Sequence, residues 1–476
     1  MKQDFSTHPL ADAAAVTRQL LDHAGLPSDT AQGLVLTGAD PELPSSFGVG
    51  TAAQATVAAA ALAACALGRQ RGQARQTVSV DQRHAALECT GWFSIDGVTP
   101  PQWDAFSGLY QTSDGWVRIH ANFPHHRDGA LRLLGLDPAT ATRADAEAKL
   151  AIWRAAAFED AAAAAGLVAT RLRSFSAWDS TAQGRAVARQ PLFTLRRIDG
   201  PHAAPLPLPP LAEGDRPLTG IRVLELTRIL AGPVGGRALA AHGADVLLVN
   251  GPHLPNIASI ADTSRGKRSA LVDLREAEGR ATLEALAEEA HVFIQGYRPG
   301  GIEARGFGPE TLAAIRPGIV YVSLTAYGTQ GPWAGRRGFD SLVQTAMGFN
   351  MAEAEAAGET RPRPLPFQAL DECTGLLMAM GAAAALHRQQ TQGGSWLVEV
   401  SLAQTGHWLR HLGRVQNGFS VSAPKTLEQP GEDAFLESSA SGFGALRAVR
   451  HSAVLSHTPA KWDKPSMPPG SHPPAW

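Results

Sequence analysis

Cysteine is scarce in this chain of 476 residues, which contains only Cys65, Cys89 and Cys373. No two of them form a C-x-x-C pair, so the sequence offers neither a disulfide framework nor a zinc ribbon. The first residues also lack the uninterrupted apolar core of a secretory signal, because Asp4 and Asp12 interrupt it. We therefore expect a reducing compartment, and the predicted localisation is the cytoplasm.

An excess of charge of one sign is missing as well. The 42 Lys and Arg residues nearly balance the 44 Asp and Glu residues, for a formal net charge of -2. Neither nucleic acid nor a membrane surface is therefore an expected partner. The longest apolar runs, 57–67 and 376–386, are alanine-rich and shorter than the ~20 residues that span a bilayer. A hydrophobic content of 44% nevertheless predicts a folded protein with a large core.

Several well-known catalytic signatures are absent. The chain has no G-x-x-x-x-G-K-[ST], no G-x-S-x-G and no H-E-x-x-H motif, which argues against kinase, α/β-hydrolase and zincin functions. Three histidines, His120, His125 and His126, lie close together in RIHANFPHHR, but no carboxylate stands at ligand spacing. No metal site is predicted.

The proline-rich stretch PHAAPLPLPPLAEGDRP at 201–217 predicts an extended linker, because proline neither continues a helix nor donates to a ladder. After it, short β-rich runs alternate with helical segments from GIRVLELT to IVYVSLT. This alternation predicts the α/β class, with a doubly wound, mostly parallel, Rossmann-like sheet at 218–425. Residues 426–476 end in a proline-dense stretch without periodicity and are expected to form an irregular C-terminal arm.

The first half of the chain shows signs of an internal repeat. The alanine-rich stretch from 57 and that from 376 are each followed by an Arg-Gln pair, a glycine turn and a Val-x-Val run. We interpret 45–200 as a partial early copy; a chance likeness of two alanine-rich helices is the alternative. Within this copy, GLYQTSDGWVRIHANF predicts a hairpin, and the helical stretches after it complete a small α+β domain. Residues 1–44 are expected to form an N-terminal helical segment.

Two features suggest chemistry. Gly232, Pro233, Gly235 and Gly236 follow a predicted strand, at the edge where α/β sheets bind ligands. A tight strand-to-helix turn would explain the same glycines, and the G-x-G-x-x-G spacing of dinucleotide sites is absent. Asp371 stands before a long apolar helix and is expected to be its N-cap. The same place suits a carboxylate nucleophile, because the helix dipole favours the ionised form.

Six motifs in order carry a resemblance to a known family: LTGIRVLELTRILAGPVGGRALAAHGADVLLV, RGKRSALVDL, FIQGYRPGGIEARGFGPETL, VYVSLTAYGTQGPW, RRGFDSLVQTAMG and ALDECTG. The sequence resembles the family III (CaiB/BaiF) CoA-transferases, which include formyl-CoA and carnitine CoA-transferases and the α-methylacyl-CoA racemases. The likeness covers about 218–415, and 45–200 is similar to the family's later part. The chain thus resembles a rearranged or tandem-truncated member, with the small domain placed before the nucleotide-type domain.

The resemblance implies one active site per chain, because the family's nucleophilic aspartate falls on Asp371 while the early copy has Ala52 near the equivalent point. Arg275 and Arg337 are the candidates for the CoA phosphates, since guanidinium pairs with phosphate oxygens. The full set of positions that the resemblance assigns to CoA is Ile229, Leu230, Ala231, Val272, Arg275, Gly296, Tyr297, Arg305 and Arg337. CoA enters as a substrate, and no metal or redox cofactor is implied.

The activity that the resemblance implies is transfer of CoA from an acyl-CoA to a carboxylic acid. The reaction would pass through an aspartyl mixed anhydride and an aspartyl-CoA thioester, helped by N–H groups of the turn 229–236 and of the helix start after Asp371. Family members form interlocked rings, so a homodimer is expected. An early copy that replaces the partner within one chain is the alternative.

Two other functions stay open. A 2-methylacyl-CoA racemase typically carries Gly-His-Asp where this chain has Gly338, Phe339 and Asp340, and a phenyl ring cannot accept a proton. A non-catalytic CoA-binding subunit would fit the early copy without an aspartate and the departures from the family pattern at Leu230 and Arg305.

Overall fold

The fold is that of a computed structural model, which describes residues 9–198, 204–424, 427 and 431–476. Parts of all five predicted segments lie outside the described residues: 1–8 of the N-terminal segment, 199–200 of the early copy, 201–203 of the linker, 425 of the Rossmann-like domain, and 426 and 428–430 of the arm.

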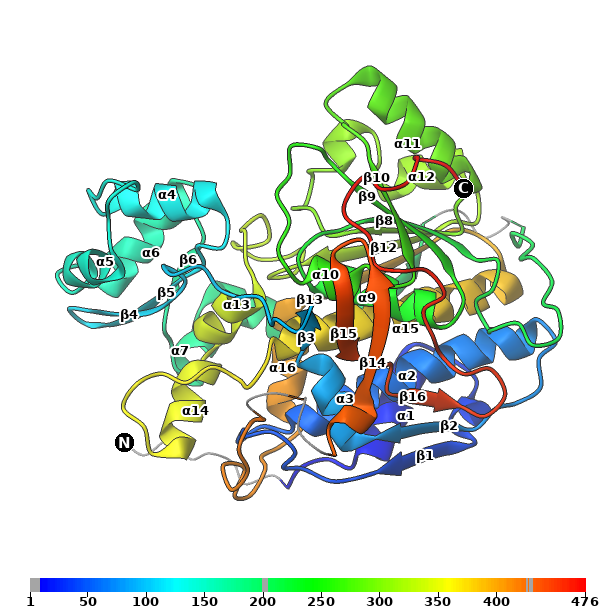
Figure 1. Ribbon diagram of the computed structural model, residues 1–476, viewed down its shortest axis with the longest axis horizontal. Helices are drawn as coiled ribbons and strands as arrows, with labels where there is room; N and C mark the ends of the chain where they lie inside the picture. The colour runs from blue at the N-terminus through cyan, green and yellow to red at the C-terminus, as the bar shows by residue number, and fades with distance from the viewer. Residues whose placement is uncertain (1–8, 199–203, 425–426, 428–430) are drawn as a thin grey trace.

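A seven-stranded sheet with the order β10-β9-β8-β11-β12-β13-β7 forms the centre of the molecule (Figure 1). Its strands are β7 (Phe193–Arg197), β8 (Arg222–Leu226), β9 (Asp245–Asn250), β10 (Lys267–Leu271), β11 (Val292–Gln295), β12 (Val320–Thr325) and β13 (Trp396–Ser401). All neighbours pair in parallel except β7, which runs antiparallel to β13. This order confirms the doubly wound fold class. Because β7 precedes the linker, the sheet extends beyond the predicted boundary at 218.

Both faces of the sheet are buried, as expected for parallel strands covered by crossover helices. Helices α9 (Ala231–Ala241) and α15 (Ala369–Gln392) lie on one face, and α11 (Ala277–Glu289) and α12 (Pro309–Ile315) lie on the other. Because successive side chains of a strand point to opposite faces, residues paired across the strands form rows, and each row packs into the core on one face of the sheet. The first row consists of Val223, Val246, Val292 and Val320, and the second of Leu224, Leu247, Phe293 and Tyr321.

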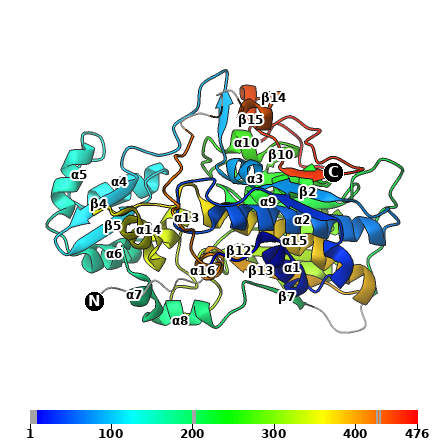
Figure 2. The ribbon, with the colours of Figure 1, turned by 90° about the horizontal axis from the view of Figure 1, so that it is seen from below.

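Helix α2 (Val49–Gln70) packs along α15 in the interior (Figure 2). Both helices extend beyond the predicted apolar runs, and by length and composition alone each could cross a bilayer. Their apolar windows are completely buried by the rest of the protein. Alanine-rich surfaces permit such close packing, so both are core helices of this fold.

The two segments of the predicted repeat have the same order of elements. In each, a long helix leads into a strand and a second helix: α2, β2 (Val78–Asp81) and α3 (Gln82–Cys89), and α15, β13 and α16 (Leu402–His411). Each strand also has one parallel and one antiparallel neighbour. These are β1 (Leu34–Thr37) and β16 (Ala453–Leu455) for β2, and β12 and β7 for β13.

The first turns of α2 and α15 share their geometry. In both, the first helical N–H donates at 2.8 Å to the carbonyl of a phenylalanine two residues earlier, Phe47 or Phe367. The third helical residues are therefore equivalent, and these are Thr51 and Asp371. The sequence placed the equivalent point near Ala52, and the equivalent residue is its neighbour, Thr51.

The small domain projects from one end of the molecule (Figure 1). The predicted hairpin is confirmed, since β4 (Gly108–Thr112) and β5 (Gly115–Ile119) pair antiparallel around it. A third strand, β6 (Ala169–Arg171), and helices α4 (Pro124–Leu133), α5 (Arg143–Leu150) and α6 (Ala155–Ala164) complete the domain around a core of its own. The chain then returns to the large sheet at β7.

Two predicted segments contain strands that were not expected. The arm at 426–476 is not irregular throughout, because β14 (Leu436–Ser441) and β15 (Gly444–Val449) form a sheet with β3 (Phe93–Ile95), and β16 pairs with β2. The N-terminal segment contains helix α1 (Ala13–His23) as predicted, but also the strand β1. Strands β14 and β15 pair with each other as a local hairpin that the sequence analysis did not predict. The other pairings, of β15 with β3 and of β16 and β1 with β2, join residues far apart in the sequence, so no local pattern indicates them.

Candidate active site

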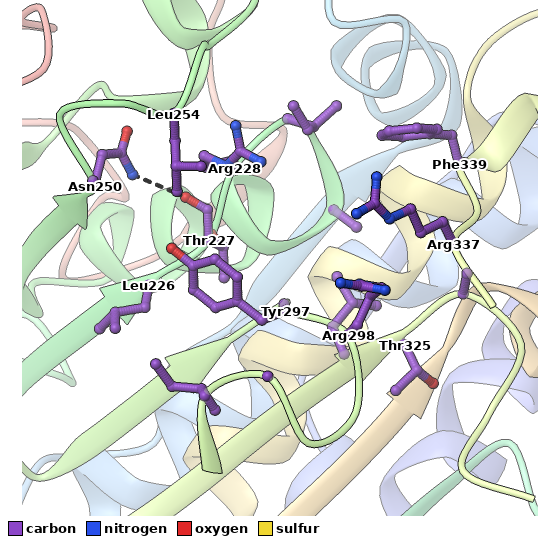
Figure 3. A pocket seen from close by; sticks show the side chains of 18 of the residues that line it. Leu226, Thr227, Arg228, Asn250, Leu254, Tyr297, Arg298, Thr325, Arg337 and Phe339 are labelled. Carbon is purple, nitrogen blue, oxygen red and sulfur yellow. Dashed lines mark hydrogen bonds between the residues drawn. The ribbon is translucent and has the colours of Figure 1, made fainter. Parts of the chain in front are cut away.

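A pocket of about 470 Å³ opens at the carboxyl ends of β8 and β11, where the strand order reverses (Figure 3). Doubly wound sheets bind ligands at such a point. All ten residues singled out in the sequence line this pocket: Ile229, Leu230, Ala231, Val272, Arg275, Gly296, Tyr297, Arg305, Arg337 and Asp371. The structure therefore brings the whole predicted set together, although their roles stay predictions.

The turn after β8 forms one wall of the pocket. Ile229 has φ +78°, a left-handed conformation that is strained for a β-branched residue and typical of ligand-binding turns. Helix α9 begins two residues later, at Ala231. The first N–H groups of a helix have no partner within it, and those of Ala231 and Gly232 make no hydrogen bond within the described part of the chain. They are free to bind a negatively charged oxygen.

Glycines allow the N-termini of α9 and α15 to meet at this wall. A Cβ on Gly375 would lie 2.4 Å from the carbonyl oxygen of Ala231. A Cβ on Gly235 would lie 2.9 Å from the carbonyl oxygen of Gly375. Larger residues would force the helices apart. The close approach places Asp371, in the first turn of α15, beside the start of α9.

Asp371 is not the N-cap of α15, so that prediction is wrong. The helix begins at Ala369, and Asp371 is its third residue. The capping carboxylate is that of Asp340, at the start of α13 (Asp340–Met347), which accepts the N–H groups of Leu370 at 2.7 Å and of Asp371 at 2.9 Å. The donors expected at the helix start after Asp371 are not free either, because the N–H of Glu372 donates to the carbonyl of Gln368 at 3.0 Å. Those of α9 remain available.

The Asp371 carboxyl lies in an environment that disfavours its charge. It is 8% exposed, and burial raises its pKa well above the usual range, with the negative charges of Asp340 and Glu372 adding to the effect. Burial likewise raises the pKa of Asp340 to about 6. Burial also raises the pKa of Glu372, against the attraction of Arg237. A carboxylate whose charge is poorly stabilised is correspondingly reactive.

Around the acid, the pocket is strongly cationic. Asp371 is the only carboxylate among the described lining residues, whereas six arginines line it: Arg228, Arg275, Arg298, Arg305, Arg336 and Arg337. Figure 3 shows Arg298 and Arg337 extending into the cavity. Arg275 is held by Asp273, with Nε 2.9 Å from Oδ1. Such a ring of guanidinium groups suits a ligand with several phosphates.

Sequence reasoning missed three of these arginines, Arg228, Arg298 and Arg336. All three had a usable signal, because Arg228 directly precedes predicted position Ile229, Arg298 directly follows Tyr297 and Arg336 directly precedes Arg337. The loops at the carboxyl ends of β8 and β11 point several neighbouring side chains into one cavity, so neighbours of predicted contacts were themselves candidates.

The small domain supplies the opposite wall. Phe123, His125 and His126 line the pocket, and His120 stacks on Phe339 with ring centroids 3.9 Å apart. Burial lowers the pKa of His126 to about 4, so its imidazole is neutral at pH 7. No group of three potential ligands with metal-binding geometry occurs among the described residues. Both halves of one chain therefore build the same pocket.

Comparison with known proteins identifies related sequences. The model of "CoA-transferase family III" matches residues 218–434. An acyl-CoA transferase of Gibberella moniliformis is 30% identical over 367 residues, or 68% of this chain and 64% of the relative. A probable fatty acyl-CoA transferase of Mycobacterium tuberculosis, Rv3272, is 31% identical over 278 residues, or 54% of this chain and 69% of the relative. A succinate–glutarate CoA-transferase of Agrobacterium fabrum is 34% identical over 205 residues, which are 39% of this chain and 51% of the relative.

Solved structures resemble the chain over part of its length. The crystal structure of Rv3272 is 32% identical, with a TM-score of 0.38, over 41% of this chain and 58% of that one. A CAIB/BAIF family protein from Brucella suis is 28% identical, with a TM-score of 0.37, and the match covers 48% of this chain and 65% of that one. The chain spans between 51% and 69% of the length of the three curated relatives above.

Proposed function

Because the chain belongs to CoA-transferase family III, we propose that it transfers CoA from an acyl-CoA to a carboxylic acid, with Asp371 as the nucleophile. One observation carries this proposal. A buried carboxylate stands in a pocket ringed by arginines, beside the free N–H groups at the start of α9. The arginines suit the phosphates of CoA, and the N–H groups suit the oxyanion of an attacked thioester.

The first half of the reaction moves CoA onto the protein. The Asp371 carboxylate attacks the thioester carbonyl, the C–S bond breaks, and CoA leaves as a thiolate. The acyl group and Asp371 are then joined in a mixed anhydride. The thiolate next attacks the Asp371 carbonyl of this anhydride, which releases the donor acid as its carboxylate. Asp371 now carries CoA as a thioester.

The second half repeats these steps with the acceptor. The acceptor carboxylate attacks the aspartyl thioester and expels the thiolate, so that a second mixed anhydride forms. Attack of the thiolate on the acceptor's carbonyl gives the new acyl-CoA and restores the Asp371 carboxylate. No proton is gained or lost over the cycle. Each addition places negative charge on a former carbonyl oxygen. A single N–H group that donates a hydrogen bond to this oxygen typically raises the rate by a factor of about 10²–10³.

Water competes with the proper nucleophile of each step, because it can hydrolyse both the mixed anhydride and the aspartyl thioester. The small domain covers the pocket with Phe123 and His126, while Phe339 and His120 stack at the junction between the two parts of the molecule. Keeping the anhydride under this cover favours attack by the thiolate over hydrolysis. The proposal therefore assigns the early segment a part in catalysis although it holds no nucleophile.

Trapping with hydroxylamine tests the proposal. The full-length protein is incubated with succinyl-CoA, or with a long-chain acyl-CoA, and then with hydroxylamine, and its peptides are analysed by mass spectrometry. We expect a hydroxamate on Asp371 in the wild type and none in Asp371→Asn. Glu372→Gln, at the next position, is the matched control and should still be labelled at Asp371. Transfer without any label on Asp371 would show that the reaction takes another course.

A further inference from the structure

The motif RIHANFPHHR places two of its three histidines in the wall of the pocket, although a cover that only excludes water does not require histidine. Helix α4 follows its N-cap residue, Phe123, and its second and third residues are His125 and His126. All three residues line the pocket that contains Asp371. The small domain thus turns the first turn of a ten-residue helix toward this pocket.

The ring of His126 is buried without a hydrogen-bond partner. The residue is 5% exposed, and neither ring nitrogen bonds to another group within the described part of the chain. Its Nδ1 is completely enclosed, whereas its Nε2 is not. A proton on Nδ1 would be a buried donor without an acceptor, so the neutral ring favours the tautomer that carries its proton on Nε2. The ring therefore presents an N–H group to the pocket that it lines.

The backbone of the same turn adds a second donor. The N–H groups of His126 and Arg127 donate to the carbonyl of Phe123 at 2.9 Å, but that of His125 makes no hydrogen bond among the residues that the structure describes. No side chain caps the helix. Two free N–H groups and the positive end of the helix dipole thus lie on neighbouring residues. A set of donors without an acceptor fits a negatively charged oxygen.

Direct contacts connect this turn to the residues that hold the nucleophile. The ring of His126 packs edge-to-face on that of Phe339, with centroids 6.5 Å apart. Phe339 directly precedes Asp340, whose carboxylate accepts the N–H of Asp371 at 2.9 Å. During the reaction the acyl group is held at Asp371, so its far end can extend toward the first turn of α4. The predicted CoA positions that follow β10, by contrast, come from the outermost strand of the sheet.

Two arginines flank the turn of α4 and offset the cost of burying an anion there. The guanidinium of Arg228 lies 5.9 Å from the ring centroid of Phe123. Arg337 reaches the small domain, where its Nη1 lies 3.4 Å from the carbonyl oxygen of Gly166 in the loop between α6 and β6. Both arginines line the pocket, and Asp371 is the only carboxylate among its described lining residues. The surrounding charges therefore favour an anion at this wall.

We propose that the first turn of α4 binds a second carboxylate of the reacting acid, so that the protein transfers CoA between dicarboxylic acids. The N–H of His125 and the Nε2–H of His126 donate to that carboxylate, while the other carboxyl group reacts at Asp371. This inference rests on the proposed function, because it assumes that Asp371 is the nucleophile. Such a site discriminates between acids, because a chain that ends in a methyl group leaves both buried N–H groups unpaired.

Isotope exchange in the full-length protein tests this inference without knowledge of the natural pair of acids. Entry of radiolabelled succinate into succinyl-CoA is compared with entry of radiolabelled butyrate into butyryl-CoA. The two acids have the same number of carbon atoms, and one ends in a carboxylate where the other ends in a methyl group. Glutarate and valerate form a second pair. We expect the wild type to exchange the dicarboxylate of each pair with a kcat/KM at least about tenfold higher.

Variants of His126 identify the group that recognises the second carboxylate. His126→Phe keeps an aromatic ring of similar size and removes the N–H group. It should lower kcat/KM for the dicarboxylates at least about tenfold and leave that for the monocarboxylates unchanged. His126→Gln supplies an amide N–H near the position of Nε2 and should recover part of the loss. His120→Phe alters a histidine that stacks on Phe339 but does not line the pocket, and it should leave the ratio within each pair unchanged.

The outcomes separate this inference from the proposed function. Absence of any exchange, or exchange without hydroxylamine labelling of Asp371, would remove the premise and the inference together. With Asp371 labelled, exchange of butyrate and valerate as fast as that of the dicarboxylates would overturn the inference alone. An equal loss with both acids of a pair in His126→Phe would also overturn it, because the ring would then act on CoA or on packing. If His126→Phe does not fold, the same ratio in His126→Ala decides.

Discussion

Asp371→Asn should abolish transfer and at the same time stabilise the protein. The substitution replaces a carboxyl by an amide of nearly the same shape, at a side chain that is 8% exposed. It leaves the cap of α15 in place, because that cap is the carboxylate of Asp340. An amide cannot form the anhydride, so transfer should fall by at least about 10³-fold. Any change in stability then reports the charge alone.

The gain in stability follows from the charges around Asp371. Its side chain makes no hydrogen bond within the described residues, and the negative charges of Asp340 and Glu372 add to the burial that raises its pKa. Replacing such an unfavourable functional group is typically worth about 0.5–2 kcal/mol. For a chain of this size, this corresponds to a rise of about 0.5–2 °C in melting temperature.

The pH dependence has a definite sign. A carboxyl whose pKa is raised in the folded state contributes stability below its unfolded pKa and loses that contribution as the pH rises through the folded pKa. The amide does not titrate. The advantage of Asp371→Asn over the wild type should therefore be largest at pH 8 and shrink toward pH 5.

Thermal unfolding of both proteins at a series of pH values, with transfer assayed on the same samples, tests this prediction. Glu372→Gln serves as a second neutralisation on the same helix that leaves the nucleophile intact. A variant Asp371→Asn that melts below the wild type at pH 8 would refute the electrostatic reasoning. Near-normal turnover would refute covalent catalysis by this residue.

Four further outcomes are expected. Lys267→Met should destabilise the protein by about 3–5 kcal/mol in urea unfolding, because it leaves Glu225 buried without its partner 2.8 Å away; the double variant with Glu225→Gln should lose less. Arg337→Gln should raise KM for acyl-CoA by about 10–100-fold, whereas Arg275→Gln, whose guanidinium is already held by a neighbouring carboxylate, should raise it less; equal effects would contradict the difference in pairing. Phe123→Ala should lower the ratio of transfer to hydrolysis, measured as new acyl-CoA against free CoA, and an unchanged ratio would remove the proposed cover. Self-association as a homodimer stays a prediction, and an active species that is monomeric by light scattering would exclude it.

The proposed dependence of CoA transfer on the early segment has to be tested with variants of the full chain. Helix α2 packs along α15, and β7 completes the large sheet. A fragment that begins after the linker would lose both and expose the core. Its inactivity would report unfolding. Substitutions on the pocket face of the small domain, such as Phe123→Ala, leave that core intact and are the better test.

The sequence alone determined the architecture and the position of the predicted nucleophile. Alternating apolar runs and helical stretches require a parallel sheet buried on both faces, and such a sheet collects the loops after its strands at one edge. The motif residues from Ile229 to Asp371 therefore had to approach one another. The ten positions themselves came from the resemblance to CoA-transferase family III, and the meeting of the strand-end loops at one edge explains why all ten line a single pocket.

Only the tertiary structure decided what surrounds that nucleophile. The cap of α15 comes from Asp340, about 30 residues away. Two strands of the C-terminal arm, β15 and β16, likewise pair with β3 and β2, more than 300 residues earlier. The physical reason is common to both. A hydrogen bond, a strand pairing or an electrostatic effect depends on distance in space, and residues far apart in the chain leave no local periodicity by which to recognise their contact.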